Sequence, residues 1–517
     1  MPPAELPVVS PAIGKHLGFT FVISRLDYRC KASCKSREAS MWKFAGLVIA
    51  AMLAGSTTAQ AQSFTAAEVA GIDAGVEGFL SQRGVPSASV AVVRGGQIVF
   101  AKAYGRRAVS PDRPATTGAG YNIASVSKQM TATALLMLVD EGKLSLDDTV
   151  DRWMPELTEA KRITVRQVLS HTAGYQGFFH SEFLSIEGRQ AISPQAIADR
   201  WATQPLDFPP GSSWSYSNTD YTIAGLIVER VSGQPLAAFL KTRIFAPLGM
   251  TSATEVTGQP AKDAQGYTRY ALGPLRPALV VGAGWGFGDG GLSMSATDLA
   301  KWDIGVLHHS LLSAKTYAEQ QTAVPLPGGK TAPYGLGVFV DQVAGHRRVK
   351  HPGSEEGFLT ENRIYPDDGA AVVVTVNGDF GGAQDDIADQ IEHLILGLPA
   401  PPKRNPRRDR PTIDAAVRPQ DLALAHKMFD QLAGGKLDRS LLTADANVYF
   451  TPTAVADYRD SLGPLGAPIA FERLQSLQVD GQDVSIYRLM WADQWVAAVM
   501  RVDPDRRVAV FKVFAPV

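Results

Sequence analysis

The spacing of apolar residues changes twice along this chain, and this change restricts its fold more than any other feature of the sequence. Residues 87–105, SASVAVVRGGQIVFAKAYG, are typical of two strands joined by a turn at Gly95 and Gly96. Helical spacing follows, and strand patterns return over residues 346–379. Strands at both ends of a helical region predict one antiparallel sheet in which the two ends pair, covered by helices.

The expected helices share apolar residues three or four positions apart and ends marked by capping residues or glycine. They are predicted over residues 125–141, from Thr164, over 220–233, from Ser295 and over 385–396. Residues 398–412, LPAPPKRNPRRDRPT, are rich in proline and arginine and lack apolar spacing, which is typical of a linker.

The segment after this linker, residues 413–517, is expected to form a separate small α+β domain. Its helix is predicted over Pro419–Leu432, and its strands are predicted over residues 448–451, 484–491, 495–502 and 508–514. Accessory, dimerisation and cell-envelope roles all stay open for it. The balanced charge of the chain, 50 Lys+Arg against 51 Asp+Glu, argues against nucleic acid or an anionic membrane surface as the main partner.

The N-terminal region carries the features of an export signal. From Met41, a basic residue precedes an apolar run over residues 44–54, and Ala59-Gln60-Ala61 offers a small-x-small cleavage site. The apolar run is shorter than the ~20 residues that cross a bilayer. We therefore expect a signal peptide at 41–61, translation from Met41 and a mature periplasmic protein without a membrane span.

Two consequences follow for the segment upstream of this signal. Residues 1–40 are expected to be a non-native extension, with an unusually long signal start as the alternative. Both cysteines, Cys30 and Cys34, lie in it, so the mature chain is expected to have no disulfide, no thiolate metal site, no cysteine nucleophile and no lipoprotein anchor.

YNIASVSKQM, residues 121–130, places Ser125 one helical turn before Lys128. Side chains three positions apart on a helix lie on one face, so the lysine can take the serine proton if burial lowers its pKa. The alternative is a helix cap at Ser125 and a solvated lysine. Ser-x-x-Lys is a weak pattern alone, because residues 40–43 match it as well.

Two further motifs follow in order, Tyr216-Ser217-Asn218 before an expected helix and His351-Pro352-Gly353 where a strand is expected to end or turn. With segments such as IFAPLGM and GDGGLSMSATDLAKW, residues 65–397 resemble the serine β-lactamase and penicillin-binding protein superfamily, especially its class C β-lactamase-like group. The resemblance implies a β-lactamase-like α/β fold. In that fold an antiparallel sheet is flanked by helices, and a mostly helical subdomain lies between about residues 147 and 294.

The resemblance also implies catalytic roles. Ser125 would attack a carbonyl and become acylated, Lys128 would act as the base beside it, and Tyr216 would pass the proton among serine, lysine and leaving group. The oxyanion would lie between the backbone N–H groups of Ser125 and Ser354. No metal ion and no organic cofactor are expected.

The remaining site residues are expected to bind substrate. Asn218 would donate or accept a hydrogen bond with the substrate amide, or it would hold Lys128 in place. His351 and Gly353 would line the site. Simpler interpretations stay open: a helix N-cap for Asn218, a buried tyrosine with a satisfied hydroxyl for Tyr216, and a strand histidine without catalytic duty for His351.

The third motif departs from relatives that carry lysine, because a histidine is only partly charged at neutral pH and Pro352 has no N–H. Glu355 and Glu356 follow and would repel an anionic substrate unless they are solvated. These features favour D-aminopeptidases, esterases or other amide hydrolases over β-lactam hydrolysis. The expected function is an exported serine hydrolase acting on a small ester or on an amide or peptide containing a D-amino acid, such as one derived from the cell wall.

Two alternatives to this function stay open, a β-lactamase or penicillin-binding DD-peptidase and a non-catalytic binding or sensor protein. His171 is a candidate for a catalytic Ser–His pair, but the resemblance implies that it lies in a structural loop. Gly286, Gly288 and Gly291 match a dinucleotide-binding pattern without the βαβ unit that it requires, so a turn near the cleft is expected there.

Overall fold

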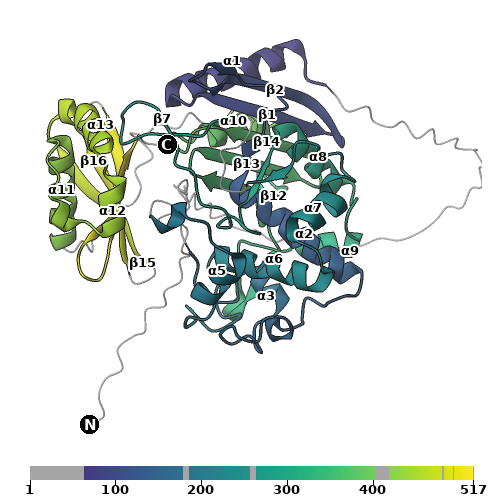
Figure 1. The fold of residues 1–517 in the computed structure, drawn as a ribbon. Coiled ribbons are helices and arrows are strands. Elements are labelled where there is room, and N and C mark those ends of the chain that lie inside the picture. The colour runs from purple at the N-terminus through teal and green to yellow at the C-terminus, as the bar shows by residue number, and fades with distance from the viewer. Residues whose placement is uncertain are drawn as a thin grey trace, which may run out of the picture.

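The structure is a computed structural model that describes residues 63–178, 186–256, 264–401, 419–479, 482–492 and 494–515. The expected upstream extension, the signal peptide and residues 402–412 of the expected linker lie outside these ranges. Two units are seen, a larger domain and a smaller C-terminal one, which occupies the left side of Figure 1.

The larger domain is built on a seven-stranded antiparallel sheet in the order β11-β12-β13-β14-β1-β2-β3. In chain order these strands are β1 (Ser87–Arg94), β2 (Gln97–Ala108), β3 (Arg113–Pro114), β11 (Phe339–Val343), β12 (His346–Glu355), β13 (Phe358–Tyr365) and β14 (Ala370–Val376). Strand β1 pairs with β14, with Ala88 opposite Val376. The predicted pairing of the two ends of the domain in one antiparallel sheet is therefore confirmed.

Helices cover both faces of this sheet (Figure 1). On one face, α1 (Ala66–Arg83) and α10 (Ala383–Ile395) share a core with Val90 and Val92 of β1. On the other face, Ala91 and Val93 join the core that contains α2 (Ser127–Asp140) and α8 (Ala296–Leu307). Successive residues of β1 thus enter opposite cores, as the two-residue period of a strand requires.

The region between β3 and β11 is mostly helical, with short strands between its helices, and it includes residues 147–294, where a mostly helical subdomain was expected. Besides α2 and α8, its helices are α3 (Val165–Leu169), α5 (Pro194–Trp201), α6 (Asn218–Ser232), α7 (Leu236–Leu240) and α9 (Ala314–Gln320). A π-helical turn over Lys241–Phe245 follows α7. Its short strands are β4 (Tyr121–Asn122), β5 (Thr254–Glu255), β6 (Tyr267–Thr268), β7 (Arg276–Pro277), β8 (Leu292–Met294), β9 (Pro325–Leu326) and β10 (Lys330–Thr331).

Local signals explain the helix boundaries near the site. The Thr164 side chain accepts the backbone N–H of Gln167 in a capping box, so α3 begins where it was predicted. Helix α6 begins at Asn218 with Ser217 as its N-cap, and Gly233 ends it in the left-handed conformation. The N-cap interpretation of Asn218 was therefore wrong by one position, which leaves the Asn218 side chain free for another role.

The C-terminal unit contains a four-stranded antiparallel sheet and three described helices. The strands are β15 (Ala470–Val479), β16 (Gln482–Met490), β17 (Trp495–Val502) and β18 (Val508–Phe514), paired in that order. The helices are α11 (Pro419–Ala433), α12 (Ala444–Tyr449) and α13 (Pro452–Leu462).

The strand predicted over residues 448–451 was wrong. Thr443 and Thr451 each accept a backbone N–H at the start of a helix, and Pro452 occupies a first-turn position. Caps and a first-turn proline favour helix over the β-branched character of the segment. Strand β15 was not predicted, because polar residues occupy much of AFERLQSLQV.

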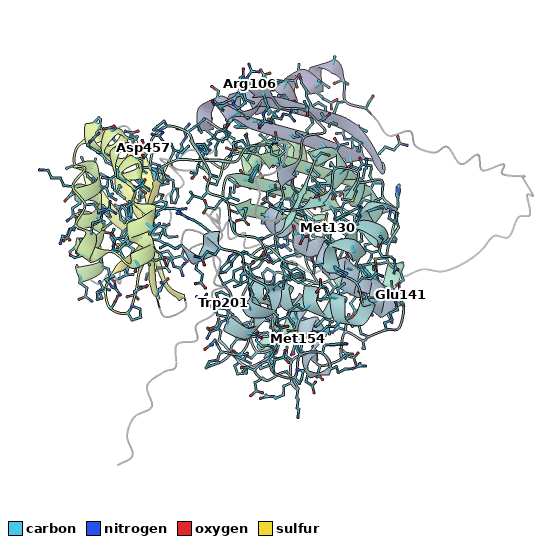
Figure 2. All side chains as sticks on the ribbon, in the orientation of Figure 1. Arg106, Met130, Glu141, Met154, Trp201 and Asp457 are labelled. Atoms are coloured by element: carbon cyan, nitrogen blue, oxygen red, sulfur yellow. The ribbon has the colours of Figure 1, made fainter. Side chains whose placement is uncertain are left out.

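The two units contact each other through the segment around β6 and β7. Arg276 donates two hydrogen bonds of 2.8 Å to the carboxylate of Asp457 on α13, which is labelled in Figure 2. The rings of Tyr270 and Tyr449 pack edge to face with centroids 5.4 Å apart. Across the described ranges, no single helix has the length and hydropathy of a membrane span; α6 and the segment Leu236–Phe245, bent by 75° to each other, reach it only as a pair.

Candidate active site

Ser125 lies in a 3₁₀ turn, Ala124–Val126, that leads into α2. The N-cap of α2 is Val126, and no side chain caps this helix. The interpretation of Ser125 as a helix cap is therefore wrong. Ala124 adopts a φ of 48°, a left-handed conformation that is costly for a residue with a side chain and that concentrates at functional sites.

Lys128 is fully buried, and its Nζ lies 3.2 Å from the Ser125 Oγ. The same nitrogen donates to the side-chain oxygen of Asn218 and to the backbone carbonyl of Asp289, both at 2.8 Å. A neutral amine has two N–H donors and one lone pair. Since the two oxygens can only accept, they take both donors, and the lone pair is left for the Ser125 hydroxyl proton.

The charge state of Lys128 favours this use. Burial lowers the pKa of Lys128 to about 8, although the carboxylates of Asp289, Glu355 and Asp220 act in the opposite direction. A pKa near 8 leaves part of the lysine unprotonated at neutral pH, as a general base requires.

Tyr216 completes the group around the serine. Its ring lies 4.8 Å from the Lys128 Nζ. Burial raises the pKa of Tyr216 far above its usual range, although a hydrogen bond with the Ser125 side chain lowers it. The phenol is therefore neutral near pH 7 and has a proton to donate, which suits a relay.

His171 supports Tyr216 from behind and does not contact Ser125 in any described interaction. Its ring lies 4.4 Å from the Tyr216 ring, and its Nδ1 accepts the backbone N–H of Ser217 at 3.2 Å. The Asp220 carboxyl lies 3.1 Å from the same nitrogen, and burial raises its pKa well above the usual range. This arrangement positions the Tyr216 loop.

The third motif lies within β12, so the prediction that a strand ends or turns there was wrong. Pairing with β13 continues through Glu355, whereas pairing with β11 stops at Lys350. Residues 351–355 are therefore an edge on the β11 side, where the missing N–H of Pro352 breaks no ladder. A Cβ on Gly353 would lie 2.1 Å from the Ile123 carbonyl oxygen, so glycine allows this edge to approach the turn that carries Ser125.

His351 is 1% exposed and points away from solvent. Its Nδ1 lies 2.7 Å from the Pro352 carbonyl and must carry the proton there, while Nε2 lies 2.8 Å from the Tyr334 hydroxyl. A neutral imidazole satisfies both contacts, because the tyrosine can donate to Nε2. The substrate contact expected of His351 stays a prediction.

Exposure separates the remaining site residues into two groups. Lys128, Asn218 and Gly353 are buried, whereas Ser125, Tyr216 and Ser354 keep part of their surface accessible. The partly exposed groups are those to which attack, proton transfer and oxyanion binding were assigned. Their assigned roles, like that of Asn218 toward substrate, stay predictions.

A family model described as beta-lactamase matches residues 72–396. The chain belongs to the beta-lactamase family. This confirms the resemblance inferred from the motifs.

Relatives of this beta-lactamase family member have several activities by name. Penicillin-binding protein 4* of Bacillus subtilis (strain 168) is 28% identical over 350 residues, which cover 64% of this chain and 77% of that protein. A D-aminopeptidase of Brucella anthropi is 27% identical over 328 residues, which cover 61% of this chain and 60% of that protein. Esterase EstB of Burkholderia gladioli is 34% identical over 241 residues, which cover 44% of this chain and 61% of that protein. The chain thus spans about three fifths of the last two relatives.

Solved structures agree on the fold. A D-stereospecific amidohydrolase from Streptomyces sp. has a TM-score of 0.55 and 25% identity, with 63% of this chain and 99% of that chain covered. An octameric penicillin-binding protein homologue from Pyrococcus abyssi has a TM-score of 0.58 and 22% identity, with 87% and 96% covered. The family match and the relatives together show that this protein is a serine hydrolase with the β-lactamase fold.

Sequence reasoning missed Asp289 as a site residue. It lies in the loop GWGFGDGG, which was expected only to be a turn near the cleft, and both its carbonyl and its carboxylate face Lys128. Burial raises the pKa of Asp289 to about 7. An isolated acidic residue in a glycine-rich turn gives no local signal of such a role. Among the described residues no cluster of three or more His, Cys, Asp or Glu side chains could hold a metal ion.

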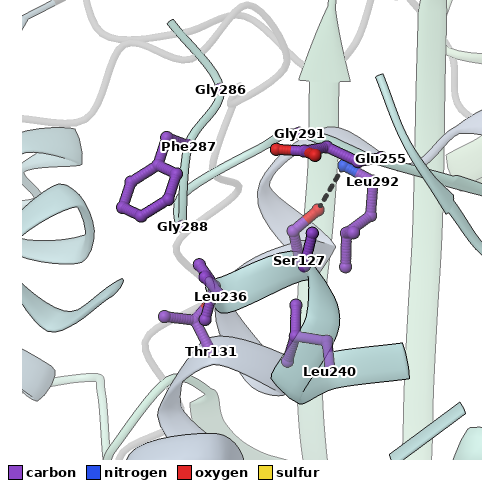
Figure 3. A pocket seen from close by; sticks show the side chains of 11 residues that line it. Ser127, Thr131, Leu236, Leu240, Glu255, Gly286, Phe287, Gly288, Gly291 and Leu292 are labelled. Carbon is purple, nitrogen blue, oxygen red and sulfur yellow. Dashed lines mark hydrogen bonds between the residues drawn. The ribbon is translucent and has the colours of Figure 1, made fainter. Parts of the chain in front are cut away.

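The same loop also lines a pocket on α2, drawn in Figure 3. Phe287, Gly288 and Glu255 contribute to its wall, and the Ser127 hydroxyl accepts the Leu292 N–H at 3.2 Å. Neither Ser125 nor Lys128 is among its lining residues, so this hollow is distinct from the catalytic group.

Proposed function

We propose that this serine hydrolase cleaves a small ester, or an amide or peptide containing a D-amino acid, through an acyl-enzyme on Ser125. The observation that carries the proposal is the environment of Lys128, whose two other acceptors leave its lone pair for the serine proton. The names of the relatives, a D-aminopeptidase and an esterase among them, support this substrate class.

In the proposed reaction, Lys128 removes the proton as the Ser125 Oγ bonds to the substrate carbonyl carbon. The oxyanion forms between the backbone N–H groups of Ser125 and Ser354, and its collapse breaks the bond to the leaving group. Tyr216 gives its proton to that group and is reprotonated by Lys128. Water then releases the acid and restores the serine.

A β-lactam or a peptidoglycan stem peptide is the second candidate, because penicillin-binding proteins are among the relatives. His351 offers such anionic substrates no permanent cation, and a neutral imidazole satisfies its contacts with Pro352 and Tyr334. The structure therefore favours the first substrate class.

The test compares the purified protein with Ser125→Ala on a p-nitrophenyl ester, a D-alanyl p-nitroanilide and a chromogenic cephalosporin, followed by intact masses. We expect turnover of the ester or the anilide that disappears in Ser125→Ala. Rapid cephalosporin turnover would favour the second candidate. Absence of both turnover and a mass shift would favour a binding or sensor protein that retains only the fold.

We also propose that the protein is exported to the periplasm, with a mature N-terminus at Gln62. The basic start, the short apolar run and the Ala59-Gln60-Ala61 site support this. N-terminal sequencing of protein recovered from the periplasmic fraction tests it. Protein that stays in the cytoplasm with residues 41–61 attached would contradict it.

A further inference from the structure

The carboxyl groups of Asp289 and Glu355 both act on the charge of Lys128, and the proposed reaction gives them no role. Asp289 is 4% exposed, and its Oδ2 lies 3.8 Å from the Lys128 Nζ. Its other oxygen, Oδ1, is buried and has no hydrogen-bond partner among the described residues. A buried carboxylate oxygen without a partner is costly, so this atom would be stabilised by a hydrogen-bond donor.

Glu355 lies at the end of β12, one residue after Ser354, and its carboxyl group interacts electrostatically with that of Asp289. A Cβ on Gly290 would lie 3.9 Å from the Glu355 Oε2 and 3.7 Å from the carbonyl carbon of Ala124. The Glu355 carboxyl group and the residue before the nucleophile therefore flank the same glycine, which has no side chain to fill the space. Glu355 is partly exposed, as Ser125 and Ser354 are, so a substrate can reach it.

The charges around Glu355 are mostly negative. Glu356 and Asp289 disfavour its ionised form, and Lys128, which acts in the opposite direction, already holds three other contacts. Burial, reinforced by the charges of Glu356 and Asp289, raises the pKa of Glu355 to about 8. A second cation at this position would offset the repulsion and would supply hydrogen-bond donors.

We propose that Glu355, with Asp289 beside it, binds the ammonium group of a substrate that carries a free amine next to its scissile carbonyl. This inference rests on the proposed acyl transfer at Ser125 and narrows its substrate class to amino-acid amides, amino-acid esters and peptides with a free N-terminus. A primary ammonium has three N–H donors, enough for the Glu355 carboxylate and the unpartnered oxygen of Asp289. An anionic substrate group would be repelled at the same position.

The first experiment uses a matched pair of anilides. D-alanine p-nitroanilide and isobutyryl p-nitroanilide differ only by an ammonium group in place of a methyl group. We expect the kcat/KM ratio of amine to methyl substrate to be at least about ten in the wild-type protein, the size of one charge-assisted hydrogen bond. In Glu355→Gln this ratio should fall about tenfold or more.

The ratio removes effects of Glu355→Gln on the general reactivity of Ser125, because both substrates share that chemistry. Glu356→Gln is the matched control: it removes a neighbouring charge that disfavours the ionised form of Glu355, so its ratio should stay at or above the wild-type value. A ratio near one in the wild type, or an unchanged ratio in Glu355→Gln, would overturn the inference.

A binding experiment separates this inference from the proposed function. Ser125→Ala is titrated with D-alaninamide and with isobutyramide by calorimetry, so no turnover is needed. We expect tighter binding of D-alaninamide, lost when Glu355→Gln is added. Equal binding of both amides would overturn the inference even if esters are hydrolysed. Absence of all turnover by the wild type, combined with selective binding, would instead refute the proposed function alone.

Discussion

The Lys128 Nζ lies 2.8 Å from the backbone carbonyl of Asp289 and 3.8 Å from the carboxylate of the same residue. One residue therefore contacts the base in two ways. The carbonyl orients the amine, and the carboxylate influences whether the amine is charged. The two effects can be separated by substitution, because only the second depends on the side chain.

Asp289→Asn should move the acid limb of the kcat/KM profile to lower pH. The negative charge of Asp289 raises the pKa of Lys128, and burial lowers it to about 8. Without that charge the pKa of Lys128 falls further, so the unprotonated base persists at lower pH. The profile between pH 5 and 10 measures the shift. The control is Asp303→Asn, because Asp303 is also buried but is not among the groups that act on the pKa of Lys128. This variant should leave the acid limb of the profile in place. An acid limb that moves to higher pH in Asp289→Asn would contradict the prediction.

Lys128→Met should lower kcat by about 10²–10⁴-fold, the usual contribution of a general base. Methionine keeps most of the volume in this buried site, so the fold should survive, as circular dichroism would show. Active-site acylation, followed by intact mass, should slow by a similar factor. Near-normal turnover would mean that another group takes the Ser125 proton.

Gly353→Ala should reduce activity at least about tenfold while the domain still folds. The new Cβ would lie 2.1 Å from the Ile123 carbonyl oxygen, a backbone atom that cannot move without shifting the turn that carries Ser125. Overpacking of this kind typically costs about 1–3 kcal/mol of stability. Thermal unfolding and kcat/KM are the measurements.

The control for this prediction is Gly71→Ala on α1, where an added Cβ meets nothing within 4 Å. That variant should keep the activity of the wild type, and its unfolding temperature should be unchanged or higher, because alanine is more favourable than glycine inside a helix. Equal activity in the two variants would show that the approach of β12 to Ile123 is not needed for catalysis.

Asp457→Ala should loosen the contact between the two units. It removes both acceptors of the Arg276 hydrogen bonds at 2.8 Å. Calorimetric unfolding should then resolve into two transitions, or an existing pair should separate further. Asp460→Ala, which removes an exposed ion pair with Arg459 within α13, should leave the scan unchanged.

Much of the fold follows from local sequence. The β-branched and apolar residues of 87–105, the turn at Gly95 and Gly96, and the caps at Thr164 and Ser295 act within a few residues, and the structure confirms each of them. The same local reasoning failed at residues 448–451. There the β-branched character was outweighed by the threonine caps at 443 and 451 and by Pro452.

The sequence by itself determined the family, the strand–helix–strand order and the motif residues Ser125, Lys128 and Tyr216 as candidates. Only the tertiary structure decided how they are charged and what surrounds them. Lys128 meets Asn218 and Asp289, which lie 90 and 161 residues away along the chain. Desolvation and Coulomb interactions depend on distance in space, and no local pattern records which distant carboxyl groups, such as Asp289 and Glu355, the fold brings beside the base.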